Sequence, residues 1–230
     1  MDSSEWRLAI TKLYAVFARY SRPQSMHAAE KHDVKKVMAR LMAAPLRDLA
    51  AENLGAYAAS ALYTIGDLGE YKHFLPRILD LSLTSTGWIG LDPEVIANKL
   101  NYTKWQQWPS DEKTAIQGAF KAGWRSSRNV SPDIREADSM LYACSAIGEN
   151  IAPLLSDWLP LGSSDSVLQL AHLVRISQNI DEDVYWREAP EPVRDLLVAW
   201  TGSRSVREAL VTGKALVSTD DQWQVDQALA

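Results

Sequence analysis

The chain has one cysteine and no long apolar run, and both features limit what it can be. A single thiol, Cys144, excludes an internal disulfide framework and is typical of a reducing compartment. No stretch approaches the roughly 18 apolar residues that a membrane helix needs. The beginning, Met1–Trp6, lacks the positive start and apolar core of a signal peptide. We therefore expect a cytoplasmic protein without a membrane segment.

Positive charge is also scarce relative to negative charge. The 230 residues include 24 lysines and arginines against 29 aspartates and glutamates, which gives a net charge of −5. General nucleic-acid binders and binders of anionic membranes depend on a positive field, so neither partner is expected. The acidic balance favours a basic protein partner. No low-complexity linker divides the chain, which predicts one domain over residues 1–230.

What the sequence does contain, almost throughout, is an apolar period of 3.6 residues, the signature of amphipathic helices. Capping side chains before acidic first turns agree with it. The periodic segments are residues 6–20, 34–41, 54–65, 115–124 and 193–200, and the caps lie at 92–94, 109–112, 131–133 and 163–165. Residues 167–176 are apolar almost all round and predict a central helix. We count about ten helices with short connections.

An internal similarity suggests how these helices are arranged. The run Leu62–Glu70 recurs in outline 79 residues later, at Leu141-Tyr142 and Ile147-Gly148-Glu149. Two steps of about 40 residues fit that spacing, which is the repeat length of HEAT-like helical pairs. The expected fold class is all-α, as an α-solenoid or an irregular array of HEAT-like pairs.

One stretch resembles a known family. The core His73-Phe74-Leu75-Pro76-Arg77 lies between a Pro-Leu-Arg segment at 45–47 and a Trp-x-x-Trp-Pro segment at 105–109. Together these segments resemble an uncharacterised family of bacterial helical proteins, over about residues 44–125. The resemblance implies a bacterial helical protein and no particular activity.

The same core contains candidate ligand-binding residues. Pro76 cannot continue a helix without losing a hydrogen bond and crowding the carbonyl of the residue four positions earlier. We therefore predict a helix break, with a short turn over 67–73, a new helix from about Leu75, and Phe74 and Leu75 buried. The break could expose Glu70, His73 and Arg77 to a ligand. The alternative interpretation is structural, with Arg77 paired to a carboxylate and His73 packed at the corner.

A second candidate pocket lies on the apolar helix 167–176, where Gln169, His172 and Arg175 form a polar strip. A satisfied buried network is the alternative there. Glu70 and His73 have the spacing of carboxylate-bridged metal sites, but a second such pair is missing. His27 and His32 have no supporting cluster. The sequence therefore predicts no metal, no cofactor and no catalytic residue.

Nine tryptophans against three phenylalanines are the remaining anomaly. Those at positions 6, 124 and 200 fit inward helical stripes. Trp88 and the run Tyr185-Trp186-Arg187 lie in expected loops, and exposed tryptophan and arginine favour interface hot spots. These four residues are the predicted partner-binding candidates.

The interpretation that combines these features is a non-enzymatic helical-repeat module that binds a protein partner, as an adaptor or a toxin-neutralising immunity protein does. Two alternatives remain open. One is a helical metal-dependent enzyme that uses Glu70, His73 and Arg77. The other is a nucleic-acid-binding repeat protein that uses a basic cluster at Lys121, Arg125 and Arg128. Oligomeric state cannot be inferred from the sequence.

Overall fold

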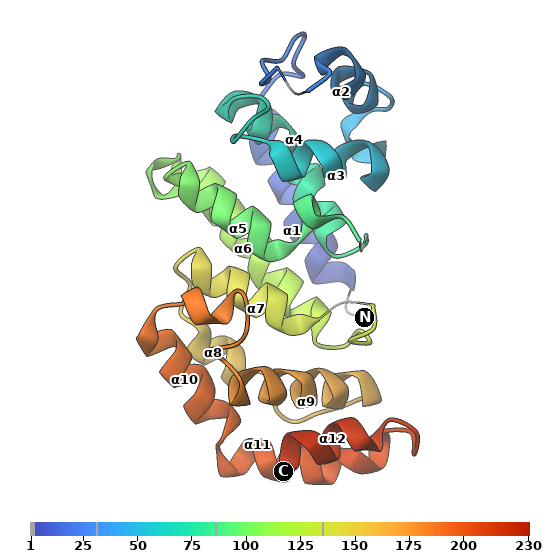
Figure 1. Cartoon of the computed structure of the whole chain (residues 1–230), viewed down its shortest axis with the longest axis vertical. Coiled ribbons are helices and arrows are strands. Elements are labelled where there is room, and N and C mark those ends of the chain that lie inside the picture. The colour runs from blue at the N-terminus through green and yellow to red at the C-terminus, as the bar shows by residue number, and fades with distance from the viewer. Residues whose placement is uncertain (1–2, 31, 86, 135) are drawn as a thin grey trace. The chain divides into compact units, whose positions relative to one another are not determined.

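The computed structural model describes residues 3–30, 32–85, 87–134 and 136–230. This part of the chain folds into twelve α-helices and five short 3₁₀ helices, and it contains no strand (Figure 1). The all-α prediction is therefore confirmed, whereas the HEAT-like arrangement stays a prediction. Within the described ranges, no helix combines the length and apolar character that a membrane crossing requires.

Two compact units divide the chain. The N-terminal unit, Ser4–Ala119, holds α1 (Ser3–Phe17), α2 (Val34–Leu41), α3 (Ala51–Ser60), α4 (Leu68–Ser82) and α5 (Pro93–Tyr102). The C-terminal unit contains Phe120–Ala230, with α7 (Ala137–Ala146), α8 (Ile151–Ser156), α9 (Ser164–Gln178), α10 (Glu191–Thr201), α11 (Arg204–Gly213) and α12 (Gln222–Leu229). Helix α6 (Ser110–Ser127) contributes residues to both units. The single domain expected over residues 1–230 stays a prediction.

Helix α4 organises the N-terminal unit. It begins with a capping box, in which the Asp67 side chain accepts from the Glu70 amide and the Glu70 side chain accepts from the Asp67 amide. The helix then continues through Pro76 to Ser82 without interruption. The predicted break is therefore wrong. Burial of most of the helix surface outweighs the one backbone hydrogen bond that the proline removes.

The burial predicted for the residues before the proline is confirmed. Phe74 and Leu75 are buried, and the Phe74 ring packs edge-on against Tyr57, with ring centroids 5.1 Å apart. Phe17 of α1 packs edge-on against Trp108 at 6.4 Å. The core of this unit is thus built from aromatic rings on α1, α3, α4 and the segment before α6.

A buried ion pair crosses this core. The Lys72 ammonium donates to a Glu112 carboxylate oxygen at 2.7 Å, and both side chains are almost fully buried. The Tyr20 hydroxyl donates to the other Glu112 oxygen at 2.6 Å. Lys72 also lies 3.9 Å from the centre of the Trp108 ring. The two opposite charges are therefore removed from water together, with partners for both carboxylate oxygens.

The 3₁₀ helix η2 (Ile89–Leu91) packs very closely on α3. A β-carbon added at Gly90 would lie 2.1 Å from the amide nitrogen of Ala59 and 2.5 Å from the carbonyl oxygen of Gly55. Trp88 covers Gly55, where an added β-carbon would meet the indole at 2.7 Å. Gly90 is therefore required by the close approach of two backbones, and Gly55 by the indole that covers it.

Replacing Gly90 with alanine should lower the free energy of unfolding by about 2–3 kcal/mol, because the new methyl group collides with backbone atoms that cannot move independently. Gly118, in the exposed middle of α6, is the matched control, since an added β-carbon there meets no atom within 4 Å. Gly118→Ala should stabilise by about 0.4–1 kcal/mol. Urea denaturation of both variants measures this difference. Equal effects at the two positions would contradict the close approach of η2 to α3.

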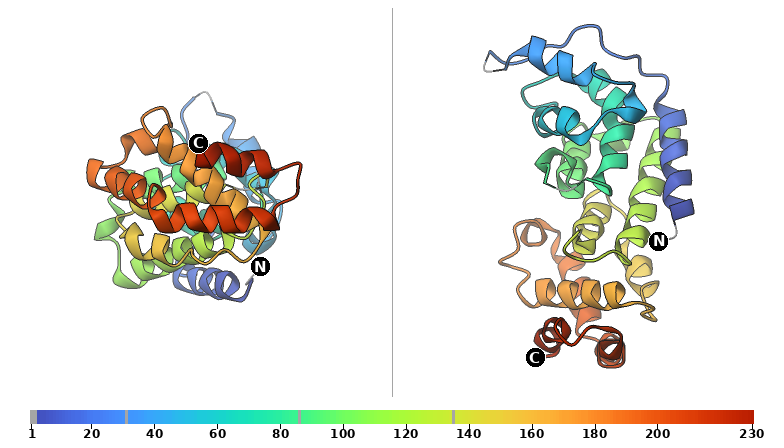
Figure 2. Two further views of the ribbon diagram at one scale, coloured as in Figure 1. Left: turned by 90° about the horizontal axis from the view of Figure 1, so that it is seen from below. Right: turned by 90° about the vertical axis from the view of Figure 1, so that its right-hand side faces the viewer.

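Helix α9 is the centre of the C-terminal unit, as its apolar sequence predicts. It contacts α7, α10, α11 and α12, and Figures 1 and 2 show it lying against the last two helices. Ser163 caps it through a capping box with Ser166. The helix start expected at residues 131–133 is wrong, because residues 132–134 form a turn and α7 begins at Ala137.

Tryptophans also fill the C-terminal unit. Trp124 packs edge-on against Trp158 with ring centroids 5.0 Å apart, and Trp158 stacks on Trp200 at 6.1 Å. The indole N–H of Trp124 donates to the carbonyl oxygen of Leu154 at 3.3 Å. The inward positions predicted for Trp6 and Trp124 are confirmed, and Trp200 is partly buried.

Candidate functional site

A hollow of about 540 Å³ opens on the N-terminal unit. Helix α1 and the residues just after it, the 3₁₀ helix η1 (Leu46–Asp48) and α4 form its walls. Its lining is mostly aromatic and apolar and includes Tyr14, Phe17, Tyr20, Leu46, Arg47 and Pro76. We call this feature the α1–α4 hollow. Its size and lining are typical of sites that accept a small molecule or one apolar side chain of a partner.

His73 also lines the α1–α4 hollow. Its Nδ1 lies 2.9 Å from the carbonyl oxygen of Tyr20, which can only accept, so Nδ1 carries the proton. Burial, and to a smaller extent the charge of Arg22, lower the pKa of the imidazole despite that hydrogen bond. The ring is therefore neutral at neutral pH. Its Nε2 is a buried acceptor without a hydrogen-bond partner among the described residues.

Two arginines lie near the α1–α4 hollow: Arg47 lines it beside Asp48, and Arg22 is close enough to His73 to lower the pKa of that residue. The Arg47 guanidinium lies 3.9 Å from the centre of the Tyr14 ring, and Arg22 donates to the carbonyl oxygens of Leu41 and Ala44 at 3.2 and 2.8 Å. Neither guanidinium is paired with a carboxylate in the described part of the chain. The lining therefore places one arginine and one aspartate beside apolar rings, with a second arginine nearby.

The structure does not bring Glu70, His73 and Arg77 together into one site. Glu70 is used in the capping box of α4, whereas Arg77 donates to the carbonyl oxygen of Leu49 at 2.8 Å and to Asp80 at 2.6 Å. Desolvation is the main cause of the raised pKa of Glu70. Each of the three side chains has its own hydrogen-bond partner, as the structural interpretation of Arg77 and His73 expects.

In the C-terminal unit, one polar cluster brings together residues that are distant in the sequence. The Nε2 atom of His172, on α9, lies 3.4 Å from Asp138 Oδ1 and 3.6 Å from Glu136 Oε1. Glu136 is the N-cap residue of α7 and Asp138 lies in its first turn. Sequence reasoning selected His172 and missed the two carboxylates. No signal in the sequence joins positions 136 and 138 to position 172.

Further charged side chains lie close to the Glu136–Asp138–His172 cluster. Arg175 Nη2 lies 3.3 Å from His172 Nδ1, and His172, Arg175, Glu182 and Asp183 line an open cavity of about 500 Å³. Burial is the largest effect on His172 and lowers its pKa, but the carboxylates of Asp138 and Glu136 outweigh it, so the pKa is raised. Desolvation, followed by the charge of Asp138, raises the pKa of Glu136.

The third residue of the polar strip has a structural role. Gln169 accepts from the amide of Ala137 and donates to the carbonyl oxygen of Val130, both at 2.8 Å. It thereby ties α9 to the start of α7. The expectation of a satisfied buried network is confirmed for Gln169.

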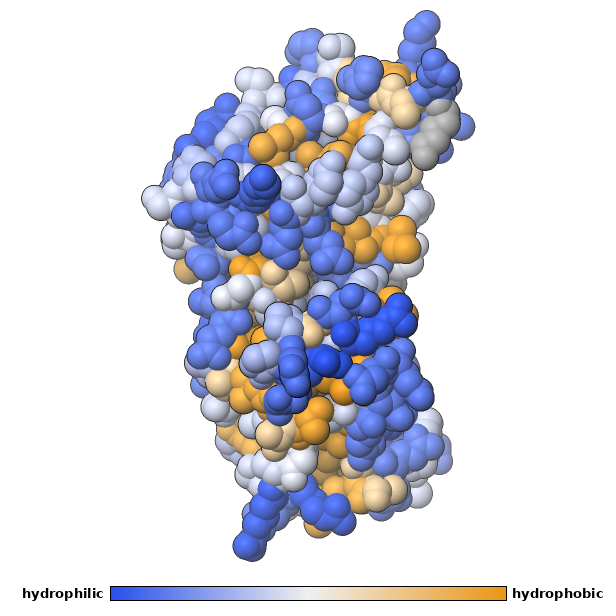
Figure 3. All heavy atoms as spheres, turned by 60° about the vertical axis from the view of Figure 1, so that its left-hand side comes forward, coloured by the Kyte–Doolittle hydropathy of each residue, from blue (hydrophilic) through white to orange (hydrophobic). Residues whose placement is uncertain are grey.

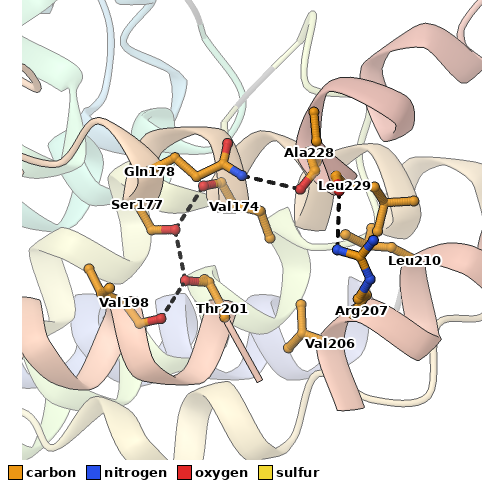
Figure 4. A pocket seen from close by; sticks show the side chains of 12 residues that line it. Val174, Ser177, Gln178, Val198, Thr201, Val206, Arg207, Leu210, Ala228 and Leu229 are labelled. Atoms are coloured by element: carbon orange, nitrogen blue, oxygen red, sulfur yellow. Dashed lines mark hydrogen bonds between the residues drawn. The ribbon is translucent and has the colours of Figure 1, made fainter. Parts of the chain in front are cut away.

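A smaller hollow of about 250 Å³ lies between α9, α10, α11 and α12 (Figure 4). Its polar groups bind one another across the helices. The Ser177 and Thr201 hydroxyls are 2.7 Å apart, Gln178 donates to the carbonyl oxygen of Ala228, and Arg207 donates to that of Leu229. These groups hold the helices together and leave few polar atoms for a ligand.

The partner-binding residues predicted near position 186 need correction. Trp186 is fully buried, and its ring lies 5.5 Å from that of Tyr142. Asp183 causes this inward turn, because its side chain accepts from the amides of Tyr185 and Trp186 at 2.9 and 2.8 Å. Tyr185 is partly buried beside Tyr142, and Arg187 is exposed. Trp88 is partly buried against Gly55.

Other predicted groups have ordinary structural surroundings. Cys144 is buried, which raises the pKa of its thiol, so it behaves as a small apolar side chain. Lys121 pairs with Glu149 at 2.7 Å, and Arg128 donates to the carbonyl oxygen of Asp157 at 2.7 Å. Arg125 is partly buried. The predicted basic cluster is therefore partly neutralised.

On the face shown in Figure 3, apolar side chains lie among hydrophilic ones and gather most in the lower half of the view. The large exposed ones include Leu8, Ile89, Ile134, Val184 and Val211. Isolated apolar residues of this kind are normal on soluble proteins and do not by themselves mark an interface.

Comparison of the chain with protein-family models, with curated proteins and with solved structures finds no match.

Proposed function

We propose that this protein acts by binding a protein partner, and that the partner inserts an apolar side chain into the α1–α4 hollow. The observation that carries the proposal is the combination of aromatic walls with two nearby arginines that have no carboxylate partner among the described residues. Interface hot spots are typically anchor side chains held in such pockets. An adaptor and an inhibitor of a toxin are both compatible with this mode of binding.

Charge narrows the chemistry of the partner segment. Arg22 and Arg47 favour a carboxylate next to the apolar anchor, because a guanidinium forms strong paired hydrogen bonds with carboxylates. The acidity of the chain lies elsewhere: residues 4–119 contain 14 lysines and arginines against 12 aspartates and glutamates, whereas residues 120–230 contain 10 against 16. The net charge favours a basic partner. Such a partner would therefore bind the C-terminal unit, where the excess of negative charge lies.

The two alternatives have weaker support. The enzyme alternative needs Glu70, His73 and Arg77 to act on one ligand, and each of them is engaged with a different group. The nucleic-acid alternative needs a positive surface, and Lys121 is paired with Glu149. Partner binding at the α1–α4 hollow requires neither condition.

Filling the α1–α4 hollow should abolish partner binding without unfolding the chain. Ala18 is exposed and lines the hollow, so Ala18→Trp places an indole where the anchor would enter. Affinity capture from the natural host, with the wild type and Ala18→Trp immobilised in parallel, measures the effect. A partner retained by the wild type should fall by about tenfold or more with the variant, as for loss of a hot spot.

The matched control is Ala39→Trp, which adds the same side chain at an exposed position of α2 outside the hollow. Circular dichroism confirms that both variants are folded. The control should retain the same partner as the wild type. Identical captured proteins on all three chains would contradict the proposal.

A further inference from the structure

The Glu136–Asp138–His172 cluster has features that a helix start alone does not explain. Asp138 is only 7 % exposed, and its Oδ1 has no hydrogen-bond partner among the described residues. His172 Nε2 is likewise buried and without a hydrogen-bond partner in that part of the chain. The two atoms contact each other at 3.4 Å, which is longer than the usual N–H···O hydrogen bond, so a cation between them would satisfy both more fully.

The spacing of the three atoms fits a single small cation. Metal–ligand distances of about 2.0–2.2 Å place neighbouring ligand atoms of a tetrahedron about 3.3–3.6 Å apart. The distances from His172 Nε2 to Asp138 Oδ1 and Glu136 Oε1 are 3.4 and 3.6 Å, and one donor atom from each residue lies within 4.8 Å of the others. Both histidine–carboxylate distances fit this spacing, and a closer approach of the two carboxylates to each other would complete three corners.

We propose that Glu136, Asp138 and His172 form a binding site for a divalent transition-metal ion, with Zn²⁺ as its best occupant. One imidazole nitrogen with two carboxylate oxygens suits Zn²⁺, whereas Mg²⁺ and Ca²⁺ prefer oxygen ligands alone. Three protein ligands leave the fourth position for water or a ligand, and His172 also lines the cavity of about 500 Å³. The site is separate from the α1–α4 hollow and does not depend on the proposed function.

Arg175 determines which form of His172 competes with the metal. An arginine N–H only donates, so its 3.3 Å contact with His172 Nδ1 requires Nδ1 to be free of a proton. The ring proton then lies on Nε2, the atom that the metal needs. Metal binding therefore shifts the proton to Nδ1 and breaks the contact with Arg175.

Because the proton on Nε2 competes with the metal, Arg175→Gln is expected to change the Zn²⁺ affinity. The change removes a positive charge beside the cation, and the glutamine oxygen can accept from Nδ1–H as the outer partners of metal-bound histidines do. Zn²⁺ affinity should therefore rise, by about tenfold if the new partner is worth what such outer partners usually contribute. A simple ion-pair cluster gives no reason for such an increase.

Isothermal titration of the chelator-treated chain with ZnCl₂ tests the site. The wild type should bind one Zn²⁺ per chain, and His172→Gln and Asp138→Asn should weaken binding by about tenfold or more. Asp138 is buried, so its replacement can also affect folding. Glu136→Gln is a second variant that should leave the fold intact, because 53 % of the Glu136 side chain is exposed. It should weaken binding in the same direction.

His27→Gln is the matched control, because it removes an exposed histidine in the N-terminal unit and should leave the affinity unchanged. Circular dichroism verifies that each variant is folded. Absence of a Zn²⁺ site in the wild type would overturn the proposal. So would a site that survives in both His172→Gln and Glu136→Gln, or one that is lost in His27→Gln.

Discussion

Replacing Phe74 with alanine should lower the free energy of unfolding by about 3–5 kcal/mol, the range for a fully buried phenylalanine. The ring is 1 % exposed, lies edge-on to Tyr57 at 5.1 Å and contacts the His73 ring at 4.8 Å. Alanine would leave a cavity in the buried aromatic core of the N-terminal unit. Urea denaturation monitored by circular dichroism measures the loss.

Leu68→Ala on the same helix is the control for Phe74→Ala. Leu68 is the first residue of α4 and is 37 % exposed, so its truncation should cost about 0.5 kcal/mol or less. A loss below about 1 kcal/mol for Phe74→Ala would place that ring at the surface and contradict the packing of α4.

Breaking the buried ion pair between Lys72 and Glu112 should lower the free energy of unfolding by a similar amount. Glu112→Gln keeps the shape of the side chain but leaves the Lys72 ammonium, 2.7 Å away, without a counter-charge in the core. The free energy of unfolding should fall by about 3–5 kcal/mol, because an uncompensated buried charge is more costly than a missing pair. Thermal and chemical denaturation measure the change.

A double-mutant cycle separates the pair from its surroundings. Lys72→Met combined with Glu112→Gln removes both charges and should cost less than the two single changes together, by about 1–3 kcal/mol. Additive losses would mean that the charges do not interact. The pair cannot be inferred from the sequence, because its members lie 40 residues apart and each is an ordinary helical residue by itself.

Local signals in the sequence predict local structure well. Ser163 caps α9 and Pro93 opens α5, because a capping oxygen or a preset proline angle acts within one turn of the chain. The same local rule fails at Pro76, which should end a helix and lies inside one. Burial on several sides of α4 is a tertiary effect, and it outweighs one missing hydrogen bond.

The candidate sites are harder to predict from the sequence than the helix ends are. Trp186 lies in an expected loop and is predicted to be exposed, yet Asp183 accepts from the amides of Tyr185 and Trp186, and the ring turns into the core. Of the Glu136–Asp138–His172 cluster, only His172 could be selected from the helical pattern, since the approach of Glu136 and Asp138 depends on how α7 packs against α9. Of the α1–α4 hollow, His73 could be selected because it precedes an unusual proline.

Photo-crosslinking in the natural host tests partner binding at the α1–α4 hollow most directly. A photoreactive benzophenone amino acid is placed at position 21, which is exposed and follows Tyr20 of the hollow without lining it, or at position 39, which lies outside the hollow on α2. We predict that irradiation links one specific protein to the chain from position 21 and not from position 39, and that Arg47→Glu reduces its yield. Equal crosslinks from both positions, or none from position 21 when position 39 gives a specific product, would contradict binding through the hollow.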